Sequence, residues 1–290
     1  MLKYLLISMR PTQWTKNVFV FAGLVFAKKL FFPSELGKAI SAFILFCLAS
    51  SAVYLINDLV DTEQDRQHPT KRNRPLPSGR LEAHWAALAI AMLLAISFPL
   101  SFWALGYRFG LVILTYLVTM LLYCFLFRKV VIIDVLTIAV GFDLRVLAGT
   151  VAISAIRFSP WVYVCTTLLA LFLGLSKRRH ELSLLNEEAP QHRQILQEYT
   201  PKLLDQMIVV TMATAIIAYC LYTFSAENLP ENHAMMLTIP FVIYGIFRYL
   251  YLVQAKGEGG EPENVLLKDP PLMIDIGLWV IACVAILYLS

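Results

Sequence analysis

The sequence has 290 residues, of which 59% are hydrophobic and 15% are charged, and its mean hydropathy is +0.68. An ordinary soluble domain is about 45–50% apolar and about 25% charged. The composition therefore excludes a typical soluble protein and predicts an all-α integral membrane protein in contact with membrane lipid. The net charge of +4 is modest, and we expect no nucleic-acid partner.

Hydropathy predicts nine spans of roughly membrane-crossing length. Residues 1–16 contain no sustained apolar core, so we expect no cleaved signal peptide. The five cysteines lie singly in apolar segments without metal-ligand spacing, and we interpret them as core residues. The expected architecture is a single domain, residues 1–290, formed by one nine-helix bundle. The predicted spans are residues 17–32, 39–59, 84–104, 110–127, 131–155, 160–175, 205–224, 234–253 and 272–289.

The distribution of Lys and Arg predicts the orientation of these spans. With the N-terminus inside, 18 of the 24 Lys and Arg residues fall on the cytoplasmic side and five, including Arg157, fall outside. Arg145 lies within the fifth predicted span. Because Lys and Arg accumulate on the cytoplasmic side, we expect a multi-pass protein of the cell membrane with two long cytoplasmic connections, at residues 60–83 and 176–204.

The first of these connections begins with an acidic helix end, NDLVDTEQD at residues 57–65. On an uninterrupted α-helix, Asn57, Asp58, Asp61 and Asp65 project at about 0°, 100°, 40° and 80°, on one face. Carboxylates so close together raise each other's pKa unless a cation lies between them. Mg²⁺ prefers oxygen ligands and commonly links carboxylates to substrate phosphates, so we expect these four residues to hold Mg²⁺ and a diphosphate. The alternative is a solvated acidic helix end.

Basic residues follow the acidic face. Guanidinium groups bind phosphate oxygens in pairs, and lysine acts as a movable point charge. Some of these residues would also satisfy the cytoplasmic preference for positive charge. The candidates for phosphate binding here are Arg66, Lys71, Arg72 and Arg74.

Together, NDxxDxxxD at residues 57–65 and RPLPSG at residues 74–79 resemble the UbiA superfamily of intramembrane prenyltransferases. The resemblance implies a helical bundle with a lateral opening to lipid and a polar cavity near the cytoplasmic face. It also implies Asp58, Asp61 and Asp65 as catalytic residues with Mg²⁺ as cofactor. Most members have a second Asp-rich motif after the sixth span, whereas this sequence has SKRRHEL at residues 176–182. Its adjacent cations Lys177, Arg178 and Arg179 suit an anionic phosphate substrate.

The N-terminal segment RPTQWTKN at residues 10–17 is similar to the decaprenyl-phosphate phosphoribosyltransferase branch of this superfamily. That resemblance implies 5-phosphoribosyl 1-diphosphate as donor and a polyprenyl phosphate as acceptor. It also favours phosphate contacts by Lys16 and Asn17, for which the alternative is that they only anchor the first helix at the membrane interface. Lys177, Arg178 and Arg179 would bind either the ribose 5-phosphate or the acceptor phosphate, and these two alternatives stay open.

The fifth predicted span carries three ionisable residues, Asp134, Asp143 and Arg145. Asp134 and Arg145 are eleven positions apart and therefore share a helical face, whereas Asp143 points roughly opposite. Charged groups within a span usually face a cavity or a partner. Two interpretations are open. Asp134 and Arg145 bind substrate, or one of the two aspartates forms an ion pair with Arg145 or with another helix.

Two other functions compete with phosphoribosyl transfer. A prenyltransferase would move a prenyl group from a prenyl diphosphate to an aromatic or other acceptor, and the missing acidic second motif disfavours it. A membrane transporter or lipid-binding protein would also place Asp and Arg inside the membrane. Transport does not account for carboxylates and a basic loop on one connection, and no inverted repeat is visible. The sequence leaves open the isoprenoid length and whether the protein is a homo-oligomer.

Overall fold

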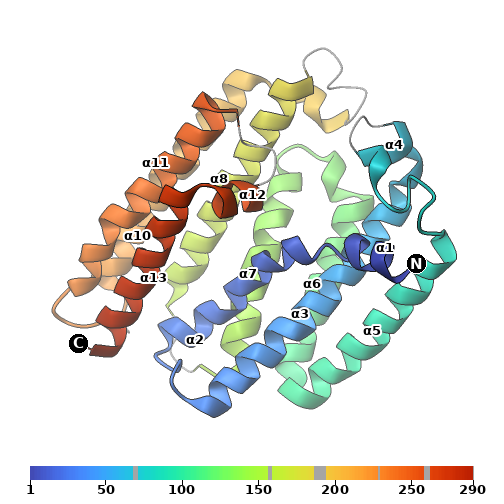
Figure 1. Ribbon diagram of the computed structural model, residues 1–290. Coiled ribbons are helices and arrows are strands. Elements are labelled where there is room, and N and C mark those ends of the chain that lie inside the picture. The colour runs from blue at the N-terminus through green and yellow to red at the C-terminus, as the bar shows by residue number, and fades with distance from the viewer. Residues whose placement is uncertain (68–70, 156–158, 186–193, 228, 258–261, 290) are drawn as a thin grey trace. The chain divides into compact units, whose positions relative to one another are not determined.

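We describe a computed structural model that covers the chain apart from residues 68–70, 156–158, 186–193, 228, 258–261 and 290. The described residues form helices and no strands (Figure 1). Eight of these helical segments are long and apolar enough to cross a membrane. The predicted outside cation Arg157 and the predicted inside cation Arg193 lie outside the described residues.

The chain divides into two compact units. The helix α7 belongs to both, since its residues up to Asp143 lie in the second unit and those from Leu144 lie in the first. The elements that begin in the first unit are α1 (Leu2–Ser8), η1 (Pro11–Phe21), α2 (Ala22–Phe26), α3 (Pro33–Val60), α4 (Thr62–Gln67), η2 (Lys71–Asn73), α5 (Ala83–Leu105), α6 (Tyr107–Phe125) and η3 (Phe127–Lys129). Those that begin in the second are α7 (Ile133–Ala152), α8 (Pro160–Leu185), η5 (Gln194–Gln197), α10 (Pro201–Ser225), η6 (Ala234–Thr238), α11 (Ile239–Ala255), α12 (Pro262–Lys268) and α13 (Pro270–Leu289).

The segment predicted as the first span is not one continuous α-helix. Residues 11–21 form the 3₁₀ helix η1, and only five residues of α-helix follow in α2. A 3₁₀ helix rises about 2.0 Å per residue against 1.5 Å in an α-helix. The eleven residues of η1 therefore cover about 22 Å.

η1 runs antiparallel to α3. Contacts between the two elements proceed in opposite chain order, with each later residue of η1 meeting an earlier residue of α3. The contacts are Arg10 with Asp58, Trp14 with Ser51, Asn17 with Ser50 and Phe21 with Phe43. The N-terminal segment thus follows α3 from its C-terminal end toward its beginning.

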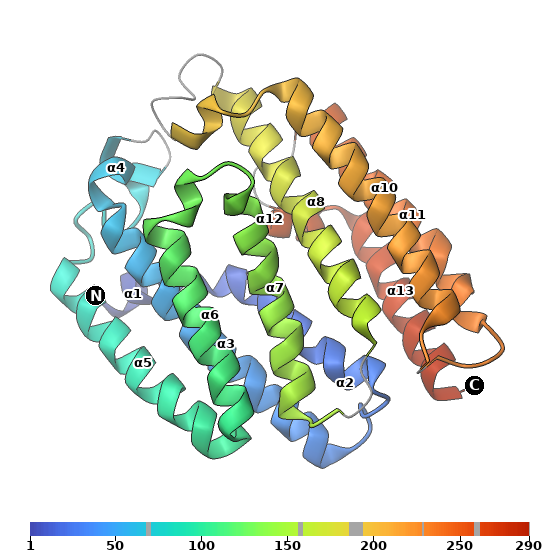
Figure 2. The same ribbon diagram turned by 180° about the vertical axis from the view of Figure 1, so that it is seen from behind.

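Buried side chains of α3, α6 and the second half of α7 form the core of the first unit, and α5 packs against it with partly buried side chains (Figure 2). The rings of Phe46 and Tyr116 lie 5.0 Å apart there. The second half of α7 packs directly on η1, because a Cβ atom built on Gly149 would lie only 1.8 Å from the carbonyl oxygen of Val20. Small residues allow this close approach of backbones within membranes.

The second unit has its own core, in which α10 packs along α8 and α11 packs along α13 (Figure 1). Helix α8 extends to Leu185, ten residues beyond the predicted end of the sixth span. No proline or glycine interrupts residues 176–185, and Arg178 pairs with Glu181 one turn ahead. The basic segment that we expected in a loop is therefore helical.

Candidate active site

The acidic motif of residues 57–65 spans a helix interruption. α3 ends at Val60, Asp61 has a non-helical backbone with φ −92° and ψ 2°, and α4 restarts at Thr62. The hydroxyl of Thr62 donates to the carbonyl oxygen of Asp58 at 2.7 Å, across this break. The uninterrupted helix on which we expected four oxygen ligands to share one face is therefore not present.

Asp58 and Asp65 form one ion cluster with basic residues. Both carboxylates are almost fully buried, with 1% and 3% of their surfaces exposed. A single nitrogen of Arg74, Nη1, lies 3.4 Å from Oδ1 of Asp58 and 2.7 Å from Oδ2 of Asp65. Lys71 approaches Oδ1 of Asp65 at 3.9 Å, and Arg10 donates to Oδ1 of Asp58. Two carboxylates that meet at one cationic nitrogen form a donor set that suits a hard cation.

Asp61 has different partners. It accepts a hydrogen bond from the amide of Asn57 at 3.2 Å and forms an ion pair of 2.6 Å with Arg128. The thiol of Cys124 donates to the amide oxygen of Asn57 at 3.6 Å. Among the described residues no group of three or more His, Cys, Asp or Glu side chains is gathered as metal ligands. The three aspartates are therefore divided between two ion clusters.

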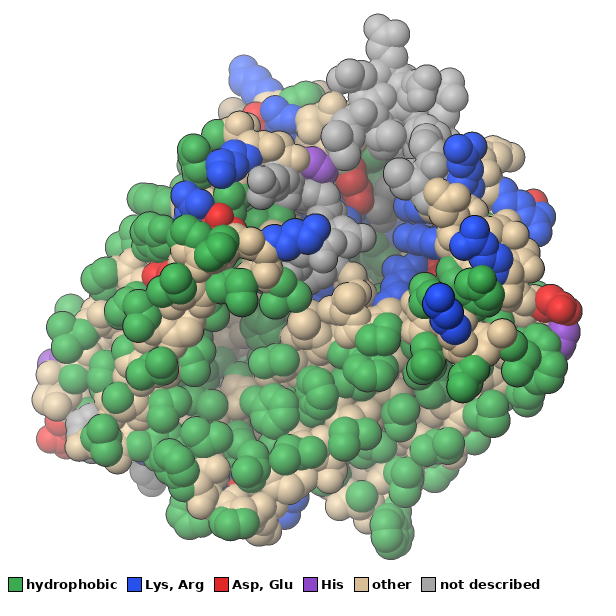
Figure 3. Space-filling view, in the orientation of Figure 1, with side chains coloured by type: hydrophobic (Ala, Val, Ile, Leu, Met, Phe, Trp, Pro, Cys, Tyr) green, Lys and Arg blue, Asp and Glu red, His purple; other side chains and the backbone are tan. Residues whose placement is uncertain are grey.

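The basic loop after the motif is stabilised by a hydrogen bond from Arg66. Arg66 donates through Nε to the carbonyl oxygen of Pro77 at 3.3 Å and pairs with Glu63 at 2.7 Å. The predicted phosphate ligand Arg66 thus supports the loop, whereas Arg72 is exposed. Lys and Arg side chains gather around α1 and α4, and hydrophobic side chains cover α3 and α5 below them (Figure 3).

Asn17 and Arg145 bind each other. Asn17 is completely buried, and its amide oxygen accepts from Nε of Arg145 at 2.8 Å. Arg145 also donates to the hydroxyl of Tyr116 at 3.1 Å. The structure thus gives Asn17 and Arg145 protein partners within the first unit, and the neighbouring Lys16 is partly buried in η1.

Asp134 contacts other side chains than Arg145 does. It accepts from Nε of Arg178 on α8 at 2.8 Å and from the hydroxyl of Tyr199 at 2.9 Å. The interpretation of Asp134 as the partner of a cation on another helix is confirmed. Asp143 accepts instead from the hydroxyl of Thr167 at 2.7 Å.

The three adjacent cations on α8 differ in their surroundings. Arg178 is 2% exposed and pairs with Glu181 at 2.6 Å in addition to its bond with Asp134. Arg179 is partly exposed and pairs with Asp205 at 2.9 Å. Lys177 is partly buried. On a helix these three side chains point about 100° apart, so they do not form one phosphate clamp on a single face.

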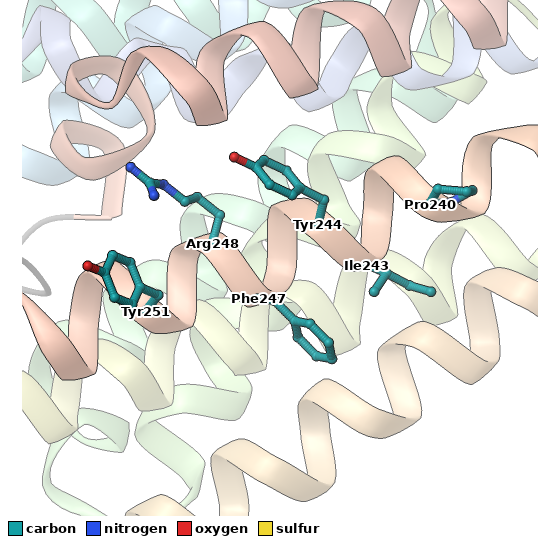
Figure 4. A pocket seen from close by; sticks show the side chains of 6 residues that line it. All are labelled: Pro240, Ile243, Tyr244, Phe247, Arg248 and Tyr251. Carbon is teal, nitrogen blue, oxygen red and sulfur yellow. The ribbon is translucent and has the colours of Figure 1, made fainter.

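An open depression of about 610 Å³ lies elsewhere, along one face of α11 (Figure 4). Its aromatic and apolar lining contains one cation, Arg248, which donates to Asp269 through Nε and Nη2 at 3.1 and 2.8 Å. It lacks the paired carboxylates and grouped cations of the acidic motif. We therefore place the candidate active site at the motif and not in this depression.

Two residues of the site were absent from the predicted set, Arg10 and Arg128. Each donates to an aspartate of the acidic motif. Arg10 opens the segment RPTQWTKN, which offered a signal through its resemblance, although only Lys16 and Asn17 were assigned from it. Arg128 follows the end of a span, a position that positive charge occupies for topological reasons as well.

Comparisons with known proteins agree with the fold and the motifs. A family model described as the UbiA prenyltransferase family matches residues 17–267. The decaprenyl-phosphate phosphoribosyltransferase of Mycolicibacterium smegmatis is 33% identical, covering 98% of this chain and 92% of its own. The protein of that name from Corynebacterium glutamicum is 34% identical, covering 97% and 86%.

The fold is also similar to a solved structure. A UbiA homolog from Archaeoglobus fulgidus bound to GPP and Mg²⁺ superposes with a TM-score of 0.74. The alignment covers 98% of this chain and 99% of that chain at 19% sequence identity. At this identity the likeness shows the helical fold alone.

Proposed function

Because the chain belongs to the UbiA prenyltransferase family, we propose that it is a phosphoribosyltransferase acting on a lipid phosphate. It transfers 5-phosphoribosyl from 5-phosphoribosyl 1-diphosphate to a polyprenyl phosphate such as decaprenyl phosphate. Diphosphate leaves, and polyprenyl-phosphoryl-5-phosphoribose forms. Full-length similarity to relatives named for this reaction supports the choice of substrates.

The observation that carries the proposal is the cluster in which Asp58 and Asp65 meet at one nitrogen of Arg74. Carboxylates and guanidinium groups together suit a metal-bound diphosphate, since the carboxylates hold the cation and the guanidinium binds phosphate oxygens. We assign Mg²⁺ to the carboxylates of Asp58 and Asp65. The carboxylate of Asp61 and the amide oxygen of Asn57 are the further ligands. When bound, Mg²⁺ neutralises charge on the diphosphate.

In the reaction, an oxygen of the acceptor phosphate forms a bond to C1 of the ribose. The bond from C1 to the diphosphate oxygen breaks, and its electron pair leaves with the diphosphate. The acceptor phosphate is already an anion at neutral pH, so this step requires no general base. Arg74 and Lys71 stabilise the charge that develops on the leaving diphosphate, with Arg72 as an exposed cation on the same loop.

The cations on α8 bind the second phosphate, which belongs either to the ribose or to the acceptor. Arg178 is held by Asp134 and Glu181, so we assign it to orient the basic segment. Lys177 then contacts the phosphate, and Arg179, which points to another face of α8 and pairs with Asp205, adds positive charge to the segment. Arg66 acts on the donor side through the loop that it supports at Pro77.

The proposed topology has nine crossings, with the N-terminus inside and the acidic motif at the cytoplasmic face of the cell membrane. The antiparallel course of η1 along α3 supports η1 and α2 as the first crossing. Apolar helix faces accommodate the isoprenoid chain of the acceptor within the lipid.

The test is a reconstituted assay with the purified full chain, Mg²⁺, decaprenyl phosphate and 5-phosphoribosyl 1-diphosphate. Equal amounts of diphosphate and phosphoribosylated lipid should appear, and chelation of the metal should stop both. An identical reaction without the lipid phosphate controls for hydrolysis of the donor. Product formation only from a prenyl diphosphate and an aromatic acid would refute the proposal in favour of prenyl transfer.

A further inference from the structure

The carboxylates assigned to the metal already have cationic partners. Asp58 pairs with Arg10 and Arg74, and Asp65 pairs with Arg74 and Lys71. Two negative groups therefore lie among three positive ones. A divalent cation that arrived alone would be repelled by these cations, and this repulsion is strong where side chains are largely removed from water.

Arg10 is held in place by more than its charge. Its backbone is left-handed, with φ 53° and ψ 64°, although Arg has a side chain and Pro11 follows. A non-glycine residue is uncommon in this region and persists where its surroundings fix it. Here the guanidinium lies 5.2 Å from the centre of the Tyr54 ring and donates to Asp58. Both contacts aim Arg10 at the acidic motif.

We propose that Arg10 and Arg74 are internal counterions of Asp58 and Asp65 that transfer to diphosphate oxygens when metal and diphosphate bind together. The proposal rests on the function assigned above and adds Arg10 to the diphosphate site. The incoming cation takes the place of the guanidinium groups at the carboxylates. The displaced guanidinium groups bind the phosphate oxygens, for which their paired N–H donors are suited.

This exchange predicts positive coupling between the two ligands. Diphosphate removes the arginines from the carboxylates and thereby raises the affinity for metal, and by linkage metal raises the affinity for diphosphate equally. Replacing Arg10 or Arg74 with a neutral residue should then have opposite effects on the two ligands. Metal alone should bind more tightly because its competitor is gone, and diphosphate should bind more weakly.

The experiment uses the full chain in lipid nanodiscs with Mn²⁺ as the probe, followed by the loss of the free Mn²⁺ signal in electron paramagnetic resonance. Titrations run with and without inorganic diphosphate, and empty nanodiscs with the same diphosphate serve as reference. For the unsubstituted protein we expect Mn²⁺ to bind at least about tenfold more tightly with diphosphate present. This comparison requires no variant.

Arg10→Gln and Arg74→Gln should each bind Mn²⁺ alone about tenfold more tightly than the unsubstituted protein. Their retention of labelled diphosphate at fixed Mn²⁺ should fall about tenfold. Arg10→Lys keeps the charge and should retain weak binding of metal alone. Arg80→Gln changes an exposed cation of the same connection and should leave both affinities unchanged.

Two results would overturn the proposal in distinguishable ways. If Mn²⁺ binds equally well without diphosphate, or if neither glutamine variant tightens binding of metal alone, the arginines are fixed structural partners while the proposed function stands. If Mn²⁺ fails to bind with diphosphate present, the metal site itself is wrong, and the proposed donor site falls with it.

Discussion

The Nε atom of Arg178 donates to Oδ2 of Asp134 at 2.8 Å, and both side chains are almost completely buried. Tyr199 donates to the other carboxylate oxygen, and Glu181 accepts a hydrogen bond from a second nitrogen of the guanidinium. This network ties the beginning of α7 to α8 and to the segment before α10. It fixes the helix on which the basic residues of the second unit lie.

Removal of Asp134 should leave Nε of the buried Arg178 without the carboxylate that accepts from it. Asp134→Ala is therefore expected to lower the free energy of unfolding by about 3–5 kcal/mol. Unfolding titrations in mixed detergent micelles measure this change. Lys202→Ala, which replaces an exposed cation on α10, is the control and should have little effect. Equal stability of Asp134→Ala and the unsubstituted protein would contradict the buried ion pair.

The hydroxyl of Tyr199 should make stability depend on alkaline pH. Burial raises the pKa of Tyr199 from 10.0 to about 12. Because the folded-state pKa is raised, this contribution to stability is complete below about pH 10 and is lost as pH rises through about 12. The stability difference between the unsubstituted protein and Tyr199→Phe should therefore shrink over this window. A stability difference that stays constant up to about pH 12 would show that folding does not raise the pKa of Tyr199.

Close packing at Gly149 should make that position intolerant of a side chain. A Cβ atom there would lie 1.8 Å from the carbonyl oxygen of Val20, so η1 would have to move. We expect Gly149→Ala to lower the free energy of unfolding by about 1–3 kcal/mol. Gly277→Ala is the matched control, because no atom lies within 4 Å of the added Cβ. Similar unfolding of the two variants would argue against the packing of α7 on η1.

Loss of a carboxylate at the metal site should abolish turnover without unfolding the protein. Asp58→Asn is expected to lower the turnover number at least about 100-fold, which corresponds to about 2.7 kcal/mol. Diphosphate release under saturating substrate measures this, with the unfolding midpoint as a check on structure. The control is Glu82→Gln, an exposed carboxylate at the end of the same connection. Normal turnover by Asp58→Asn would remove Asp58 from the site.

Local sequence patterns predicted much of the helical framework. Runs of apolar residues are sufficient to identify spans, since every backbone polar group in lipid must be satisfied within a helix or a closed barrel. The predicted segments at residues 39–59 and 84–104, for example, form α3 and α5. The prediction was less successful for residues 17–32, because hydropathy does not distinguish the 3₁₀ geometry of η1 from an α-helix.

For the acidic motif, too, one part of the sequence prediction was wrong. The sequence predicted its position and chemistry from residue types, but the angular argument assumed a helix that continues through Asp61. The backbone is non-helical at that residue, and its side chain has other partners than Asp58 and Asp65 have. Helical periodicity contains no information on such an interruption.

By itself, the sequence determined the membrane class, the family resemblance and the oxygen and nitrogen groups available for a metal and phosphates, since these follow from composition and local motifs. Only the tertiary structure decided which group binds which. It placed Arg10 on Asp58 across 48 positions of chain and Arg145 on Asn17 across 128. Such pairs form because buried charges must find partners when helices pack, and that packing depends on contacts between segments distant in the chain.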